Sequence, residues 1–557
     1  MYPRLWKKFT SLARYMKKPL ETQEIRKENE VEQPISPNLD NNISMLKDLF
    51  QNCSDVVFRE FTLGTRKPVR ATLVYIDGLC EADKINQHIL KSLMLEADLS
   101  TGNLSLDKSL IQTVRKRLLT IGDVKTTKML QKIVTYILSG DPGLFLDGCA
   151  TALIPNARGW ESRGVSEPES ETVVRGPRDG FTENLRTNAT LLRRRIKTTR
   201  LKFEAMEIGL LTKTVVNIAY IQGIANEKVV EEVRNRLQRI DVDSILESGY
   251  IEELIEDSPF SIFPQINATE RPDRVVSGLL EGQVAILVDN TPFGLLAPVT
   301  FPQFLQAAED YYLRYPLVLF MRLLRFVSLN ISLLLPSVYI AVTTYHQEML
   351  PTPLLISIAA AREGVPFPAL VEALAMEFTF EILKEAGVRL PRQVGQAVSI
   401  VGALVIGDAA VTAGLVSPAM VIVVSLTAIS SFTIPNYTGS TTIRLLRFPI
   451  MLLAGTLGFY GIMVALMALL IHLCSLRSFG VPYLSPLAPL SLRDLKDTFI
   501  RVPWWAMFTR PRLIGTREPA RQDYISRPGP GRGKTRTKPT PYSEGGHRNA
   551  GPREDFQ

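Results

Sequence analysis

The chain has 557 residues, a formal net charge of +8 and four cysteines. The cysteines lie far apart and form no C-x-x-C pair, so neither a disulfide framework nor a zinc site is expected, and the thiols are expected to be reduced and buried. The modest positive charge is more typical of a surface that faces the cytoplasm beside a membrane than of a domain that reads nucleic acid.

Charged residues are segregated along the chain. They are dense before Arg325 and after Arg477, whereas residues 409–443 and 448–476 contain no Asp, Glu, Lys or Arg. A helix of about 20 apolar residues is long enough to cross the hydrocarbon core of a bilayer. We therefore expect an α/β soluble N-terminal region of two small subdomains, followed by a polytopic α-helical membrane domain.

Residues 1–44 are polar and rich in Lys and Glu, followed by Pro, Asn and Asp. This composition predicts a flexible arm. The basic N-terminus is not followed by an apolar run of signal-peptide length, so the soluble half is expected to stay in the cytosol.

Residues 45–160 are expected to form the first α/β subdomain. The segment 69–76 has the composition of a strand, and Asp77-Gly78 supplies the turn that ends it. Helical spacing of apolar residues recurs in segments 84–95, 109–119 and 127–138, and a short strand is expected at 144–146.

Residues 161–312 are expected to form the second α/β subdomain. The pattern predicts, in order, a basic helix over 184–207, a strand over 214–220, helices over 227–240 and 245–256, and a strand, turn and strand over 283–296.

Residues 313–476 are expected to form the membrane domain, with about four spans near 325–345, 394–412, 418–436 and 449–474. Between the first two spans, residues 369–386 predict a helix that carries four glutamates. On a helical wheel Glu377, Glu381, Lys384 and Glu385 share one face, and Glu372 lies off it. Either this helix lies at the membrane surface with a solvated face, or it borders a water-filled path.

The distribution of arginines gives a mixed topology signal. Basic residues precede the first span and follow the last one, which places both termini in the cytoplasm. Arg444 and Arg447 would then lie on the far side, against that rule. Residues 477–557 are expected to be a basic cytoplasmic tail, disordered after about residue 515 because of its solvated composition.

Several blocks in order along the chain resemble the A subunits of GerA-type spore germinant receptors. The most specific block begins Arg175-Gly-Pro-Arg-Asp-Gly-Phe-Thr-Glu-Asn, and Ser139-Gly-Asp-Pro-Gly precedes it. In the membrane half, Arg362-Glu-Gly-Val-Pro-Phe-Pro and Val401-Gly-Ala-Leu-Val-Ile-Gly-Asp follow. The resemblance covers about residues 45 to 512, and the Arg/Gly/Pro-rich tail lies outside it.

The resemblance implies a subunit in the inner membrane of the spore. It further implies a homo-oligomer, as a pentamer, together with a transporter-like B subunit that binds the nutrient and a lipoprotein C subunit. In such a receptor the A subunits form a nutrient-gated cation channel, and membrane lipid is the remaining partner. A non-conducting scaffold that relays the signal from the B subunit is the alternative function.

A stripe of valines is the candidate gate of such a channel. Val394, Val398, Val401 and Val405 recur with helical spacing, so a ring of these stripes would form a hydrophobic constriction that gates by dewetting. The alternative is that the stripe packs against a neighbouring span. Asp408 just beyond it, with Glu377 and Glu381, completes the candidate pore residues, because a carboxylate in a membrane favours a water-lined position.

The arginine-rich block is a candidate contact site and not a catalytic one. The guanidiniums of Arg175 and Arg178 could hold a phosphate or a carboxylate at the start of the following helix, but no Walker motif or G-x-G-x-x-G accompanies them. Arg175, Arg178 and Asp179 are therefore candidates for a contact between domains or subunits. A salt-bridged loop between domains or subunits is the simpler interpretation. The four histidines are scattered and no activating serine motif occurs, so no enzyme, cofactor, metal site or nucleic-acid partner is expected.

Overall fold

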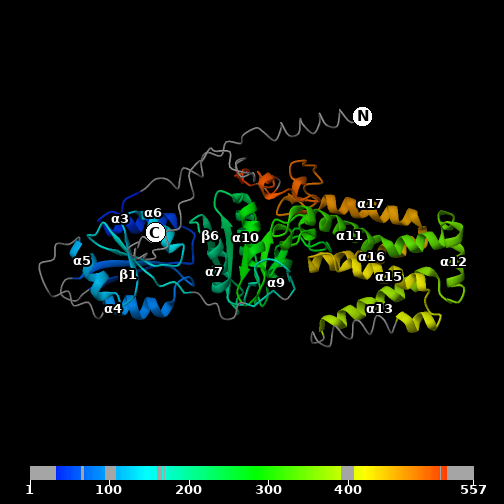
Figure 1. Cartoon of the computed structure of the whole chain (residues 1–557), viewed down its shortest axis with the longest axis horizontal. Coiled ribbons are helices and arrows are strands. Elements are labelled where there is room, and N and C mark those ends of the chain that lie inside the picture. Colours follow the sequence, from blue (N-terminus) through cyan, green and yellow to red (C-terminus); the bar gives the residue numbers. More distant parts are fainter. Residues whose placement is uncertain are drawn as a thin grey trace, which may run out of the picture.

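The computed structural model describes residues 33–63, 68–94, 108–159, 166–168, 170–389, 407–512, 514 and 516–522. Three parts lie in a row along the long axis of the molecule (Figure 1). Two α/β subdomains form one end, and an elongated bundle of helices forms the other. The fold expected for the N-terminal half, two small α/β subdomains, is confirmed.

The first subdomain is a five-stranded antiparallel sheet in the order β1-β2-β4-β5-β3 with helices on both faces. Helices α3 and α6 cover one face, and the helices between β2 and β3 cover the other. Its elements are α3 (Leu39–Leu49), β1 (Val56–Leu63), β2 (Val69–Ile76), η1 (Lys84–Lys91), α4 (Ser92–Met94), α5 (Lys108–Thr113), η2 (Val114–Leu118), β3 (Val124–Thr127), α6 (Leu130–Ile137), β4 (Gly143–Leu146) and β5 (Ala152–Pro155).

The second subdomain repeats this arrangement. Its sheet has the order β6-β7-β9-β10-β8, with α7 and α10 on one face and α8 and α9 on the other. Its elements are α7 (Leu185–Arg195), β6 (Leu201–Ile208), β7 (Thr214–Ile221), α8 (Glu227–Gln238), α9 (Ser248–Ile255), β8 (Asn267–Thr269), α10 (Pro272–Glu281), β9 (Val284–Val288) and β10 (Gly294–Ala297).

Two expectations for the soluble half were wrong at their boundaries. The helix expected over 184–207 ends at Arg195, and residues 201–208 form β6, whose Leu201 and Phe203 are buried in the core. The flexible arm expected over 1–44 is also too long. Helix α3 begins at Leu39 and is capped by the side chain of Asn38, and it packs Leu39 and Ile43 into the first core because both are apolar.

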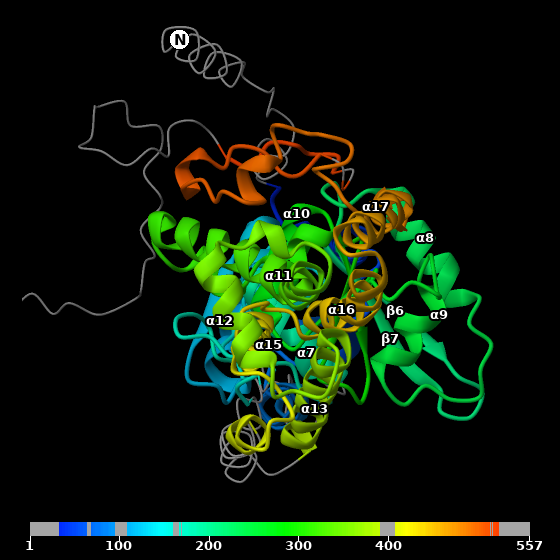
Figure 2. The ribbon, with the colours of Figure 1, turned by 90° about the vertical axis from the view of Figure 1, so that its right-hand side faces the viewer.

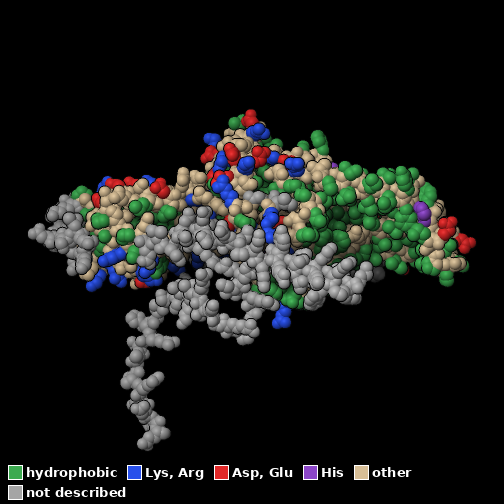
Figure 3. Space-filling model, turned by 90° about the horizontal axis from the view of Figure 1, so that it is seen from above, with side chains coloured by type: hydrophobic (Ala, Val, Ile, Leu, Met, Phe, Trp, Pro, Cys, Tyr) green, Lys and Arg blue, Asp and Glu red, His purple; other side chains and the backbone are tan. Residues whose placement is uncertain are grey.

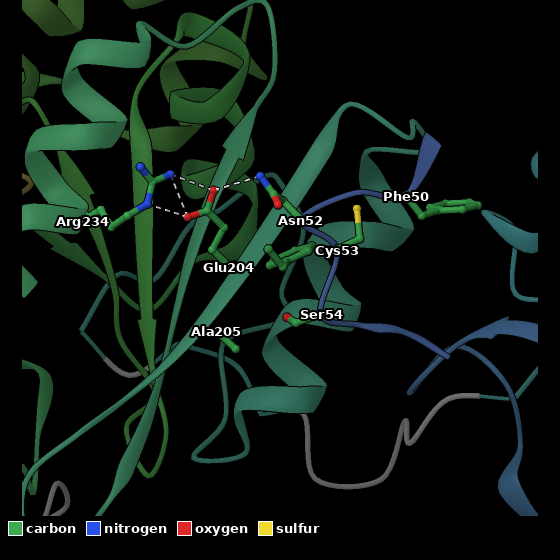
Figure 4. Close-up of a pocket in the computed structure, with 8 residues that line it drawn as sticks. Phe50, Asn52, Cys53, Ser54, Glu204, Ala205 and Arg234 are labelled. Carbon is green, nitrogen blue, oxygen red and sulfur yellow. Dashed lines mark hydrogen bonds and ion pairs between the residues drawn. The ribbon is translucent and has the colours of Figure 1, made fainter. Parts of the chain in front are cut away.

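Direct contacts join the two subdomains. The Arg193 guanidinium is fully buried and forms two hydrogen bonds with the Asp55 carboxylate, at 2.8 and 2.9 Å. The backbone of residues 52–54 pairs with Phe203 at the edge of β6. A cavity of about 590 Å³ opens at this seam, where Glu204 accepts hydrogen bonds from Arg234 and Asn52 (Figure 4). Because Arg193 is paired with Asp55 and Arg234 with Glu204, these contacts form a rigid joint between the subdomains.

The helical half consists of long helices that run back and forth along the axis of the molecule (Figure 1). They are α11 (Tyr315–Thr344), α12 (Thr352–Arg362), α13 (Ala369–Arg389), α15 (Pro418–Ser431), α16 (Tyr437–Leu457) and α17 (Phe459–Ser475). Hydrophobic side chains cover much of the face of this half that is in view, whereas Lys, Arg, Asp and Glu gather on the subdomains, and Asp and Glu also lie at the far tip (Figure 3).

Among the described residues, one helix is long and apolar enough to cross a membrane, and this is α11. It contains residues 325–344 of the first expected span, 325–345. Three shorter apolar helices are α12, α15 and α17. The span expected over 449–474 is not one helix, because the chain turns at Gly458, with φ of +59°, and α16 and α17 pack against each other on either side of it. Most of the expected span 394–412 lies outside the described residues.

After α17 the chain returns to the second subdomain. A short hairpin of β11 (Arg477–Ser478) and β12 (Val481–Pro482) leads into a cluster in which Tyr483 is buried with Phe263 and Phe304. The following residues, up to 522, lie along α10 and the start of α11; we refer to residues 493–522 as the C-terminal strap. The chain therefore enters and leaves the helical half at the same end.

Candidate functional site

Two of the carboxylates expected to line a water-filled path, Glu377 and Glu381, form ion pairs between α13 and α16. Glu377 and Arg447 are both fully buried, and their closest charged atoms are 2.9 Å apart. Arg447 also reaches Glu381 at 3.3 Å, and Arg444 pairs with Glu381 at 2.6 Å. Within one chain, Glu377 is therefore paired away from solvent and Glu381 is paired and partly exposed, and their role beside a water-filled path stays a prediction. We name these four residues the charged core.

The antiparallel packing of α13 and α16 produces this core. Glutamates four residues apart on α13 face arginines three residues apart on α16, so each pair of charges lies on one side of its helix. Further along, Gly455 lets Leu370 approach closely, since a Cβ at Gly455 would lie 2.6 Å from the Leu370 side chain. In a low-dielectric interior, an unpaired charge costs several kcal/mol, so these pairs hold the two helices in register.

A second buried cluster ties α12, α13 and α15 together. The Glu372 carboxylate accepts hydrogen bonds from the backbone N–H and the hydroxyl of Ser417, both at 2.6 Å. Ser417 is the N-cap of α15, and Arg362 lies 3.7 Å from the other oxygen of Glu372. Glu372 thus joins α13 to α12 and α15, and Glu377 and Glu381 join it to α16.

The remaining candidate pore residues follow α13. The valine stripe, Val394, Val398, Val401 and Val405, lies outside the described residues. Asp408 is described, in a short helical segment that ends at the Gly414 turn, and its side chain is exposed in the single chain. The structure therefore places Asp408 at the surface of the bundle, Glu377 inside it and Glu381 between α13 and α16 with part of its side chain exposed.

A third charged cluster anchors the first membrane helix to the soluble half. Asp310 is fully buried and contacts Arg325 at 2.7 Å and Arg322 at 3.1 Å. Arg322 also pairs with Asp497 of the strap at 2.9 Å, and the Tyr311 hydroxyl donates to the same carboxylate. Burial, and next the charge of Asp497, raise the pKa of Tyr311 far above its ordinary value, so this hydroxyl remains a donor.

The arginine-rich block lies on the second subdomain and does not bridge the two subdomains. Arg178 is exposed and pairs with Glu167 at 3.1 Å, while Asp179 pairs with Arg195 of α7 at 2.5 Å. Arg175 is exposed and forms no ion pair with the residues that the structure describes. Contacts between the subdomains come instead from Arg193 and Arg186, which pair with Asp55 and Asp77.

Sequence reasoning treated Arg444 and Arg447 as a conflict in the topology and missed their role. The available signal was their spacing. Two glutamates at i and i+4 in one helix and two arginines at i and i+3 in another, each in a weakly charged region, are suited to pair. Among the described residues, no three side chains of His, Cys, Asp or Glu are arranged to hold a metal.

Residues 44–513 match the family model of the Bacillus/Clostridium GerA spore germination protein. Spore germination protein KA of Bacillus subtilis (strain 168) is 49% identical over 505 residues, which cover 90% of this chain and 92% of that protein. An uncharacterized membrane protein, YfkQ, of the same organism is 48% identical over 87% of this chain and 93% of its own length.

Spore germination protein B1 of Bacillus subtilis (strain 168) is 41% identical over 86% of this chain and 97% of its own length. A crystal structure of the N-terminal domain of the A subunit of the Bacillus megaterium spore germinant receptor GerK3 is 38% identical. It covers 49% of this chain and 99% of that domain, with a TM-score of 0.39. The family model and the relatives each extend over most of the chain, so this protein belongs to the GerA family of spore germination proteins, as an A subunit.

Proposed function

We propose that this A subunit acts in a nutrient germinant receptor of bacterial spores and that several copies form a cation channel which opens when a nutrient binds. Its family supports the role in spore germination, and a relative named as a membrane protein, together with the apolar surface of the helical half, supports a membrane location. The family assignment also agrees with the expectation that the chain is not an enzyme.

The charged core is the observation that best supports the channel. Ionised side chains are expensive in a bilayer, and those retained there usually mark ion pathways or moving elements. Here the pairs fix α13, the helix that leads directly into residues 390–406 and the valine stripe. Movement of α13 relative to α16 would therefore be transmitted to the segment that the sequence predicts as the gate.

In the proposed assembly, residues 390–412 of each copy face a common axis, and the copies form a pentamer in the inner membrane of the spore. The Val394 to Val405 stripe forms the dry constriction, and Asp408 lies at its mouth as a site for cations. The soluble subdomains and both ends of the helical half lie on the cytoplasmic side, which agrees with the entry and exit of the chain at one end of the bundle.

The proposed receptor contains two further chains, a transporter-like B subunit that binds the nutrient and a lipoprotein C subunit. The signal would reach this chain through its helical half or its soluble half. The cluster of Asp310, Arg322, Arg325 and Asp497 joins these halves, so a shift of either one displaces the start of α11.

Potassium flux from vesicles tests the proposal directly. The purified receptor is reconstituted into K⁺-loaded vesicles, and K⁺ release is recorded with and without a panel of amino acids and sugars. We expect release that depends on one nutrient and on this chain. Receptors that bind the nutrient and trigger germination in spores, yet pass no K⁺, would support the non-conducting scaffold instead.

A further inference from the structure

Four exposed apolar side chains lie where the chain leaves the helical half and returns along α11. They are between 37% and 67% exposed, and they are Leu490, Leu492, Phe499 and Ile500. Between them in the sequence, Asp494 is buried and Asp497 is paired with Arg322 of α11. Acidic side chains therefore turn inward here and apolar ones turn outward, which is the reverse of what water favours. We name the four exposed residues the apolar rim.

The apolar rim lies beside the start of the membrane helix α11. Phe499 packs on Phe326 of that helix, with ring centroids 5.0 Å apart. Helix α11 has 30 residues, so it is about 45 Å long, whereas the hydrocarbon core of a bilayer is about 30 Å thick. Because Arg322 and Arg325 are charged, the part within the hydrocarbon begins after them, and residues 326–344 are about 28 Å long. Phe326, and the rim beside it, then fall at the boundary between hydrocarbon and headgroups.

Aromatic side chains near the same level have the character of a membrane interface. Trp504 is 45% exposed, and its indole N–H donates to the Tyr311 carbonyl at 3.1 Å. Tyr315, in the first turn of α11, is 47% exposed. Trp and Tyr are enriched where a membrane meets water, because each combines an apolar ring with a polar group. In Figure 3 the hydrophobic surface of the helical half gives way to charged and polar side chains at this end.

Four arginines without an acidic partner lie at this end of the helical half. Arg314 precedes α11, Arg477 follows α17, and Arg493 and Arg512 belong to the strap. Arg493 is half-buried and the other three are exposed. None of the four forms an ion pair with a residue that the structure describes. We name them the boundary arginines.

The acids of the same segments do not neutralise the boundary arginines. Three of the five acids in residues 307–316 and in the described part of 477–522 are paired with other arginines; these are Asp310, Asp497 and Glu518. Asp494 is buried and accepts hydrogen bonds from the Ser491 hydroxyl and the Arg512 backbone N–H. Glu309 is half-buried. An excess of positive charge therefore remains at the boundary, and this suits an anionic surface.

No residue that the structure describes covers the apolar rim. Figure 2 looks along the molecule from the helical end and shows the orange part of the chain after α17 at the outer edge, outside α10 and α11. The rim thus faces the surroundings of the molecule, at the level where its surface changes from polar to hydrophobic.

We propose that the apolar rim inserts into the cytoplasmic leaflet of the membrane and that the boundary arginines bind the phosphates of anionic phospholipids. The proposal rests on the proposed function, which places the helical half in a membrane and the soluble subdomains on its cytoplasmic side. A guanidinium binds a phosphate through two parallel hydrogen bonds, and each basic residue near an anionic leaflet adds attraction. A leaflet meets all four arginines at one level, although they come from separate segments of the chain. Because Asp497 and Phe499 contact α11, lipid bound here would hold the first turns of that helix at the membrane surface.

Fluorescence quenching in vesicles measures the depth of the rim in the full chain. The exposed native thiol is removed by Cys474→Ser, and Leu492→Cys then carries a fluorescent label. Glu231→Cys, at an exposed position of α8, marks the soluble half, and Met467→Cys, at an exposed position of α17, marks the helical half. The quenchers are iodide in the water and nitroxides attached to lipid, either near the headgroup or near the end of the acyl chain.

We expect the nitroxide near the headgroup to quench the label on Leu492→Cys at least about twofold more strongly than the label on Glu231→Cys, and iodide to show the reverse order. Quenching of the Leu492→Cys label by iodide alone would place the rim in water and overturn the proposal. Protection of that label from iodide and from both nitroxides would show that another protein chain covers the rim, which would also overturn it.

Spin-labelled phosphatidylglycerol and phosphatidylcholine, compared at equal mole fraction, measure the preference for anionic lipid. We expect phosphatidylglycerol to quench the Leu492→Cys label at least about twofold more strongly. Arg493→Gln with Arg512→Gln is expected to remove at least about half of this excess, because two of the four charges are lost.

Arg59→Gln with Arg239→Gln is the matched control, because both arginines are exposed on the soluble subdomains and the change of net charge is the same. It is expected to leave the lipid preference unchanged, and equal unfolding midpoints verify that both double variants are folded. Equal quenching by the two lipids in the unmodified chain, or an equal loss of preference in both double variants, would overturn the role of the boundary arginines.

Potassium flux from the same vesicles separates the lipid contact from the proposed channel. If iodide alone quenches the label on the rim while a nutrient still releases K⁺, the lipid contact is refuted and the channel stands. If quenching is as expected but no nutrient releases K⁺, the channel is refuted and the lipid contact stands. If neither nitroxide quenches the label on Met467→Cys, the membrane location of the helical half is refuted, and both proposals fall with it.

Discussion

Arg447 is the fully buried arginine of the charged core, and it pairs with both Glu377 and Glu381. Replacing it by leucine leaves Glu377 buried without its partner, which costs about 3–5 kcal/mol. We expect Arg447→Leu to lower the amount of chain in spore membranes severalfold, as measured by immunoblotting. Adding Glu377→Gln removes the unpaired charge and is expected to restore much of the loss. Arg389→Leu, which breaks only the exposed pair with Glu385, is the control; an equal loss there would contradict this reasoning.

Substitutions in the valine stripe are expected to have opposite effects on germination if the stripe forms a gate and if it packs against other helices. If Val398 or Val401 lines a dry constriction, substitution by alanine admits water and causes ion release without nutrient, or premature germination during sporulation. If the stripe is packed between helices, the same change leaves a cavity that costs about 1–3 kcal/mol and lowers abundance. Asp408→Asn is expected to reduce K⁺ release while assembly is unaffected. If spores of both valine variants release no ions without nutrient and do not germinate prematurely, the stripe is not the gate.

At the scale of elements, the strap contacts an acid of α10, Glu281, that makes its attachment sensitive to pH. Burial raises the pKa of Glu281 on α10 from 4.5 to about 7, against the lowering effect of Arg521 at 3.5 Å. The folded state therefore binds the proton more tightly than the unfolded state. Stability from this group is present at low pH and is lost as the pH rises from about 4.5 to about 7.

We expect the unfolding midpoint of the purified chain, followed by tryptophan fluorescence, to fall as the pH rises from about 4.5 to about 7, partly through Glu281. In Glu281→Gln the fall is expected to be smaller, because the side chain no longer ionises. Glu231→Gln, at an exposed position of α8, should change nothing. A fall of equal size in all three chains would assign the pH dependence to other groups, of which Asp497 and Lys496 are the nearest.

Sequence patterns predicted correctly those elements whose residues favour one type of secondary structure and carry no competing signal. The strand expected over 214–220 is β7, Thr214–Ile221, because most of its residues are β-branched or apolar. The sequence predicts helix up to residue 207, and Lys, Glu, Ala and Met do favour helices, but pairing with β7 and burial of Leu201 and Phe203 outweigh that propensity in β6. The break at Gly458 was invisible in a run of uncharged residues.

The candidate site could be predicted only in part, for a similar reason. Hydropathy marks Glu377, Glu381, Arg444 and Arg447 as unusual, and each was singled out. Their pairing depends on how α13 and α16 pack, over a separation of more than 60 residues in the sequence, and no local pattern contains that information. The duplicated α/β topology was also missed, since the two sheets share an order of strands and not an evident repeat of residues.

At the scale of the whole molecule, two of the connections between the soluble and helical halves converge on α11. One is the start of α11, where Asp310 binds Arg322 and Arg325. The other is the strap, which contacts the soluble half through Arg510 and the Leu280 carbonyl, and α11 through Asp497. Because both connections converge on Arg322, displacement of the strap or of the second subdomain acts on the same helix.

Two truncations distinguish the strap from the residues that follow it. A chain that ends at residue 522 keeps every contact described for the strap, and we expect spores with this chain to germinate close to normally. A chain that ends at residue 509 loses Arg510, which donates to the Leu280 carbonyl at 2.7 Å, and Arg517, which pairs with Glu227. It also loses Arg521, the cation beside the buried Glu281.

The longer truncation is therefore expected to lower both the unfolding midpoint of the purified chain and its abundance in spores, and germination is expected to fall in proportion to abundance. Removal of residues 516–557 is expected to lower the unfolding midpoint and the abundance to an intermediate degree, because it takes away Arg517 and Arg521 and spares Arg510. The composition of these residues alone would predict no effect. Equal stability of the chains that end at 509, 515 and 522 would show that the strap is not a structural connection. Loss of germination at unchanged abundance in the chain that ends at 522 would assign a direct role to the residues beyond it.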